Sequence, residues 1–211
     1  MFPFIKATIE TLYMVLVSGS IAGLCGLSIG LWMYATSSAH LLAQRNVYRF
    51  VSVVANIVRS IPFIIFMIIL IPVTRLIVGT SIGTHAAIVP LTLAAIPFFA
   101  RLSESVFAEL PSGLLEAGKA MGATPRQILC HMVLPEALPG LIRAMTVMLI
   151  TLVGYSAMAG IVGGGGLGTL AYNEGYQHFN ATVMLITTVI LIVLVQAIQS
   201  TGDYLAAHYT R

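Results

Sequence analysis

The glycine run from Gly163 to Gly168 has the spacing G-x-G-x-x-G, which binds dinucleotide phosphates when it joins a strand to a helix. Here a long apolar stretch precedes the run, and no lysine accompanies it to complete a phosphate-binding loop. We therefore expect no nucleotide site. The glycines are better suited to turning the backbone sharply, or to letting it approach a neighbouring subunit or another protein closely.

Side chains that could act as nucleophiles or metal ligands are isolated from one another. Ser156 lacks a histidine base within the predicted apolar segments, where only His85 borders one of them. The five histidines are dispersed, and Cys25 and Cys130 lie far apart in the sequence. We expect two free thiols, no metal site, no catalytic residue and no cofactor bound by this chain itself.

The composition indicates a protein that is embedded in a lipid bilayer. Of the 211 residues, 58% are hydrophobic and 8% are charged, whereas about a quarter of the residues of a soluble domain are charged. The mean hydropathy is +0.98. The apolar runs are continuous rather than alternating, which favours helices over membrane strands. The small, scattered net charge of +3 speaks against binding to nucleic acid. The composition therefore predicts an all-α, multi-pass membrane protein.

Intervals with few charges predict five transmembrane helices in a single domain, residues 1–211. Each interval can supply the roughly 20 residues that cross a bilayer. With the N-terminus outside and the C-terminus in the cytoplasm, seven lysines and arginines fall in inner segments and two in outer segments, as the positive-inside rule requires. The predicted spans are 10–36, 50–72, 84–107, 139–161 and 180–204. The inner cations are Arg45, Arg49, Arg101, Lys119, Arg126, Arg143 and Arg211, and the outer ones are Lys6 and Arg75.

Arg59 interrupts the second predicted span at mid-depth, where an arginine costs about 2.5–3.5 kcal/mol. It could neutralise a substrate carboxylate. Alternatively, it could reach the cytoplasmic headgroups or a carbonyl freed by Pro62. Other candidates for a solute path are the aromatic, methionine and small residues of the third and fourth spans, although such residues also serve as ordinary packing. They are Phe98, Tyr155, Ser156 and Met158.

The first predicted span carries small residues four apart, such as Gly19 with Gly23 and Gly26 with Gly30. Small residues let helix backbones approach closely in a membrane, where hydrophobicity gives no reward for association. The pattern predicts tight packing either within the chain or at the interface of a dimer.

Between the third and fourth spans, residues 112–121 predict a short helix that Gly122 ends in a left-handed cap. The sequence from Thr124 to Gln127 then predicts a capping box with proline at the first helical position, and a second short helix running to Val133. We expect Leu134-Pro135 to stop this second helix. Such a helical hairpin could dock in a groove of a soluble partner or simply fill a loop.

This segment resembles the EAA loop of ABC importer permeases, whose pattern is E-A-A, three residues, G, nine residues and I-x-L-P. The spacing matches, with Gly118 in place of the second alanine and Met132 in place of isoleucine. Other strings resemble the permease family of bacterial methionine importers, which has the same short five-span layout. They are Arg59-Ser60-Ile61-Pro62-Phe63, Ile71-Pro72-Val73-Thr74-Arg75 with Val78-Gly79-Thr80, and Gly154-Tyr155-Ser156-Ala157-Met158.

The resemblance implies a multi-pass protein of the bacterial cytoplasmic (inner) membrane. It implies a homodimer with two cytoplasmic ATPase subunits, which hold the ATP and Mg²⁺, and a lipid-anchored extracytoplasmic protein that delivers D- or L-methionine. A permease for another small amino acid is the main alternative, followed by a self-contained carrier or channel, which the lack of acidic residues deep in the spans disfavours. The coupling helices implied, about 112–134, include Glu116, Ala117, Gly118, Gly122, Ala123, Thr124, Pro125, Leu134 and Pro135.

Overall fold

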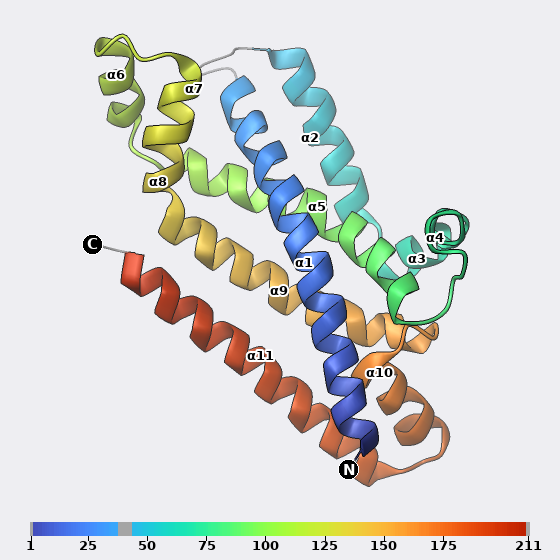
Figure 1. Ribbon diagram of the computed structural model, residues 1–211. Coiled ribbons are helices and arrows are strands. Elements are labelled where there is room, and N and C mark those ends of the chain that lie inside the picture. The colour runs from blue at the N-terminus through green and yellow to red at the C-terminus, as the bar shows by residue number, and fades with distance from the viewer. Residues whose placement is uncertain (1, 38–43, 210–211) are drawn as a thin grey trace.

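The structure is a computed structural model that describes residues 2–37 and 44–209, so Arg211 lies outside the described residues. The described residues are helical and contain no strand (Figure 1). The helices are α1 (Phe2–Thr36), α2 (Arg45–Ser60), α3 (Phe63–Ile69), α4 (Ile71–Val78), α5 (Thr84–Ala108), α6 (Ser112–Ala120), α7 (Pro125–Ile128), α8 (Leu134–Glu136), α9 (Leu138–Ile161), α10 (Gly166–Leu170) and α11 (Ala181–Tyr209), with π-helical turns η1 (Leu129–Val133) and η2 (Ala171–Gln177).

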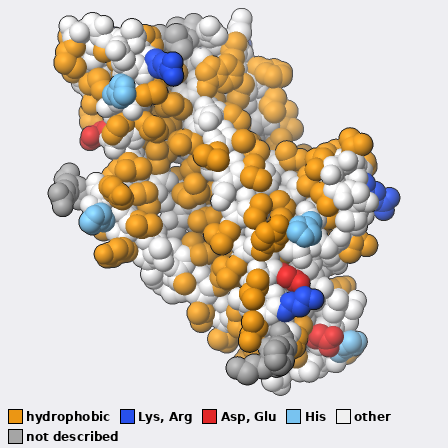
Figure 2. All heavy atoms as spheres, viewed as in Figure 1, with side chains coloured by type: hydrophobic (Ala, Val, Ile, Leu, Met, Phe, Trp, Pro, Cys, Tyr) orange, Lys and Arg blue, Asp and Glu red, His pale blue; other side chains and the backbone are white. Residues whose placement is uncertain are grey.

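Four of the described helices, α1, α5, α9 and α11, are long and apolar enough to cross a membrane. The bent pair α2 and α3 adds a fifth candidate if it counts as one span. Helix α1 begins at Phe2, ahead of the range 10–36 expected for it, while α5, α9 and α11 cover the other expected ranges closely. Hydrophobic side chains dominate the surface seen in Figure 2, and the few charged ones lie mostly toward its upper and lower parts.

The range 50–72 expected for the second span is not one helix, because it includes most of α2, all of α3 and the start of α4. The axes of α2 and α3 differ by 104°. The cause is local: a residue before proline is driven from the helical region, and Ile61, before Pro62, is extended at φ −82°, ψ 126°. Hydropathy alone does not register this break.

Helix α1 packs closely on α5 through glycines. A β-carbon at Gly26 would lie 2.9 Å from the Ile96 carbonyl oxygen, and one at Gly30 would lie 2.6 Å from that of Ala100. At Gly19 and Gly23, a β-carbon would meet side chains of α9 instead. These small residues therefore serve packing within the chain, the first of the two alternatives.

The start of α1 is tied to the glycine run. Gly165 and Gly166 have φ values of +85° and +71°, which favour glycine. This conformation lets the Gly166 N–H donate to Glu10 Oε2 and the Leu167 N–H donate to Thr11 Oγ1, both at 2.9 Å. The run thus turns the chain into α10 and fixes it to the first helix.

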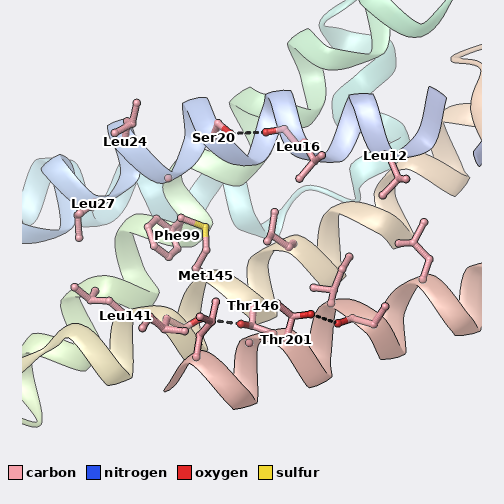
Figure 3. A pocket seen from close by; sticks show the side chains of 18 of the residues that line it. Leu12, Leu16, Ser20, Leu24, Leu27, Phe99, Leu141, Met145, Thr146 and Thr201 are labelled. Carbon is pink, nitrogen blue, oxygen red and sulfur yellow. Dashed lines mark hydrogen bonds between the residues drawn. The ribbon is translucent and has the colours of Figure 1, made fainter. Parts of the chain in front are cut away.

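A groove of about 1120 Å³ lies between α1 and α11, and residues of α9, which packs directly on α11, also line it (Figure 3). Leucines such as Leu16 and Leu24 line it together with Phe99. The hydroxyls of Ser20 and Thr201, which also line it, donate to carbonyls of their own helices. The groove therefore exposes a hydrocarbon surface.

Candidate functional site

The helices α6 and α7, with η1 and α8, form a hairpin of residues 112–136, hereafter called the hairpin, that projects from one end of the molecule (Figure 1). It has its own small core, in which Leu115 of α6 and Ile128 of α7 are buried. Phe107 at the end of α5 and Tyr34 at the end of α1 belong to the same cluster. The hairpin is therefore packed on the ends of two long helices.

Gly118 and Met132, the two departures from the EAA pattern, contact each other inside this core. A β-carbon at Gly118 would lie 2.9 Å from Ile128 Cγ1 and 3.0 Å from Met132 Sδ. The long methionine side chain thus occupies space that an alanine at 118 would need. Glycine at 118 thus leaves room for both Ile128 and Met132.

The turn of the hairpin has the conformation expected from the sequence. Gly122 lies in the left-handed region at φ +72°. The predicted capping box is confirmed: Thr124 Oγ1 accepts from the Gln127 N–H at 3.4 Å, and Gln127 Oε1 accepts from the Thr124 N–H at 2.8 Å. Together they fix the direction in which α7 leaves the turn.

The expectation that Leu134-Pro135 stops the second helix is wrong. The chain stays helical from α7 through η1 and α8 to Glu136, and α9 begins at Leu138. Proline is tolerated here because η1 is a π-helical turn, in which the Leu134 N–H donates to the Leu129 carbonyl five residues back. The wider turn relieves the crowding that a proline causes in an α-helix.

The candidate coupling residues occupy different surroundings in the hairpin. Glu116, Ala117, Gly122, Thr124 and Pro125 are exposed around its tip, as is Pro135 further along. Gly118 is buried, whereas Ala123 and Leu134 are half-buried. Sequence reasoning missed Met121, whose side chain is 71% exposed beside the turn, although its place next to Gly122 was a usable signal.

A second candidate site lies at the break between α2 and α3. The Arg59 guanidinium carbon stands 5.6 Å from the centre of the Phe98 ring, and the Phe63 and Tyr155 rings stack at 4.4 Å between centroids. These four side chains, with Val58, Ile61, Phe66 and Ala94, line a cavity of about 130 Å³. The cavity combines a fixed positive charge with aromatic surface, which suits a small solute with an apolar side chain and a carboxylate.

The structure brings together three of the five predicted path residues, Arg59, Phe98 and Tyr155. Ser156 is buried, and its hydroxyl donates to the Val153 carbonyl of its own helix at 2.7 Å. Met158 is 46% exposed and does not line the cavity. Sequence reasoning missed Phe63 and Phe66, although both follow Pro62 closely and could have been found from it.

Several helices long and apolar enough to cross a membrane, with an exposed helical hairpin between two of them, fit a membrane transport permease, and the family match shows this class. The chain belongs to the family described as "Binding-protein-dependent transport system inner membrane component", whose model matches residues 26–210.

Within this family, the chain is similar to named permeases of methionine transport systems. A Vibrio cholerae protein, "Probable D-methionine transport system permease protein MetI", is 52% identical over 201 residues, which cover 95% of this chain and 89% of that protein. An Escherichia coli protein, "D-methionine transport system permease protein MetI", is 54% identical over 160 residues, 76% of this chain and 74% of that one. A chain of a solved structure of the MetNI methionine ABC transporter, in an inward-facing conformation, superposes with a TM-score of 0.98 at 52% identity, covering 100% of this chain and 98% of that one.

Proposed function

We propose that this chain is the permease subunit of an ATP-driven importer that carries methionine across the bacterial cytoplasmic membrane. The observation that carries the proposal is the full-length similarity to the permease chain of the MetNI methionine transporter, at 52% identity and a TM-score of 0.98. The similarity covers the whole chain, and therefore includes the segments that form the cavity and the hairpin.

In this proposal two copies of the chain pair in the membrane, and each hairpin sits in a groove of one ABC ATPase, which binds ATP and Mg²⁺. Glu116, Ala117 and the turn at Gly122 form the docking surface, with Met121 as an apolar anchor. Because the hairpin packs on the ends of α1 and α5, closure of the ATPases moves these helices and opens the path outward. A lipid-anchored binding protein delivers the methionine from outside.

The cavity at the α2–α3 break belongs to the solute path in this proposal. Arg59 offers a counter-charge for the carboxylate of methionine. Phe63, Phe98 and Tyr155 offer aromatic surface, against which a thioether makes favourable contacts. The interaction of Arg59 with Phe98 supports this assignment over the alternative that the guanidinium reaches the headgroups.

The bent pair α2 and α3 counts as the fifth span, and the N-terminus lies outside. The bias of lysine and arginine toward the inner segments supports this orientation. The hairpin and the N-terminus lie at opposite ends of the molecule (Figure 1), as a cytoplasmic hairpin and an outer N-terminus require.

Transport by the reconstituted complex tests the proposal. The chain is purified with its ABC ATPase, placed in liposomes, and supplied with ATP and the binding protein. We expect accumulation of labelled methionine that excess unlabelled D- or L-methionine abolishes and excess histidine or leucine leaves intact. Equal competition by the other amino acids would assign the permease to a broader or different substrate.

A further inference from the structure

Helix α2 carries a polar stripe along its length. Five polar residues, Arg45, Arg49, Ser52, Asn56 and Arg59, follow one another at alternating spacings of four and three residues. This spacing places them on one face of an α-helix. Arg45, Arg49, Asn56 and Arg59 are exposed, and Ser52 is half-buried. On the opposite side, Val54 is exposed and apolar.

The stripe is unsuited to hydrocarbon. Arginine and asparagine are costly in a lipid core unless they face protein or water. The stripe ends at Ile61 and Pro62, where the backbone is not helical, and irregular backbone at membrane depth is tolerated only when it is buried in protein or lines a water-filled cavity. Both features require water or protein along this side of α2.

The charge of the stripe is not neutralised by the neighbouring helix. On α5, Arg101 donates to Ser52 Oγ at 3.4 Å, and Glu104 pairs with Arg101 at 2.5 Å. The carboxylate of Glu104 is thus already matched by a cation. Within the part of the chain that the structure describes, Arg49 and Arg59 form no ion pair. The stripe therefore carries net positive charge.

The stripe also connects two sites. Arg59, near the end of α2, lines the cavity at the α2–α3 break. Helix α2 begins, at Arg45, toward the same end of the molecule as the hairpin (Figure 1). We infer that the polar face of α2 lines a wet, electropositive passage along which the carboxylate of the transported amino acid moves from Arg59 toward Arg49 and the cytoplasm. This inference rests on the proposed function, and deepens it by assigning the release route.

Thiol labelling tests the passage in the complex with its ATPase. Cys25 and Cys130 are first replaced by serine, and a single cysteine is introduced as Asn56→Cys on the stripe or as Val54→Cys on the opposite side. Anionic and cationic methanethiosulfonate reagents are then compared. We expect Asn56→Cys to react with both reagents, with an anion-to-cation rate ratio at least threefold above that of a free small thiol, because positive potential concentrates anions.

The anion-to-cation rate ratio tests whether the passage is electropositive. We expect Arg59→Gln to lower it toward the free-thiol value, and high salt to do the same. Val54→Cys should react slowly with both reagents. Should Asn56→Cys disturb insertion, Ser52→Cys takes its place in the same comparison. A stripe cysteine that resists both reagents in every nucleotide state, or that reacts with the free-thiol ratio, overturns the inference.

Methionine uptake measured on the same preparations separates the two proposals. A complex that imports methionine but has an unreactive stripe contradicts the passage and leaves the proposed function standing. A complex that is reactive at Asn56→Cys and imports a different amino acid contradicts the assigned substrate and leaves the passage intact.

Discussion

At the scale of single residues, Gly118 and Met132 contact each other in the core of the hairpin, so each constrains what the other can be. We expect Gly118→Ala alone to lower stability by about 1 kcal/mol, because overpacking outweighs the gain in helix propensity. Adding Met132→Ile should recover only part of the loss, because Ile128 Cγ1 would still lie 2.9 Å from the new β-carbon, and the coupling energy in a double-mutant cycle should be about 0.5 kcal/mol. Thermal unfolding of the purified protein in detergent measures this, and strictly additive effects would contradict it.

Gly122 tests the turn without any steric complication, since a β-carbon there would meet nothing within 4 Å. Only the left-handed backbone at φ +72° penalises a side chain, by about 1–2 kcal/mol, and asparagine tolerates that region better than valine. We expect Gly122→Asn to keep the ATPase bound and Gly122→Val to weaken binding. Co-purification of the ATPase checks this, and equal recovery with both variants would show that the turn is not part of the docking surface.

Local residue patterns were readable from the sequence, and long-range ones were not. The capping box at Thr124 and the cap at Gly122 follow from residues a few positions apart. The bond between Glu10 and Gly166 spans 156 residues, and a single charged residue near a chain end gives no sign of such a partner. The stacking of Phe63 on Tyr155 could not be predicted either, because these two residues also lie far apart in the sequence.

At the scale of elements, the contact between α1 and α5 depends on backbones that nearly touch. A β-carbon at Gly30 would lie 2.6 Å from a carbonyl oxygen and 2.8 Å from Ser103 Cβ, so two helices must move apart to admit it. At Gly23 the obstacle is the flexible end of Met145. We expect Gly30→Ala to destabilise the protein by about 1–3 kcal/mol and Gly23→Ala by clearly less. Similar unfolding temperatures for both variants would contradict this packing.

The link between α1 and α10 depends on a buried hydroxyl. Thr11 is 1% exposed and accepts from the Leu167 N–H, so Thr11→Val keeps the shape of the side chain and leaves a buried donor unsatisfied. We expect a loss of about 1–3 kcal/mol. Thr8→Val is the matched control, because the Thr8 hydroxyl donates only within its own helix, to the Phe4 carbonyl. If Thr8→Val lowered the stability as much as Thr11→Val does, the loss could not be attributed to the hydrogen bond between Leu167 and Thr11.

Element prediction from hydropathy succeeded where one helix crosses the whole apolar interval, as in α5 and α9. Hydropathy did not reveal the break within the interval 50–72, because the apolar content of a segment is the same whether its helix is straight or bent. The bend of 104° follows from one Ile-Pro step. Sequence reasoning ended the hairpin too early at Pro135, because a π-helical turn has no simple sequence signature.

At the scale of the whole molecule, similarity to the permease of an ABC transporter indicates that a separate ATPase supplies the energy for transport. Carriers driven by proton or sodium gradients use acidic or histidine side chains deep in the membrane. Glu104, the acidic residue within the predicted third span, is buried in an ion pair with Arg101 at 2.5 Å, so its charge is already matched by a cation of this chain. In the proposed mechanism, the helices transmit motion and the hairpin is the place where motion enters.

Vesicles that contain only this chain should therefore not accumulate methionine, whichever proton or sodium gradient is imposed. Adding the ATPase, ATP and the binding protein should start uptake, and Gly122→Val should reduce it in proportion to the ATPase lost, since the path itself is untouched. Protein incorporation and orientation, measured by protease protection, serve as the control. Gradient-driven accumulation by the chain alone would mean that it has its own coupling site, and that the hairpin is not the point through which energy enters.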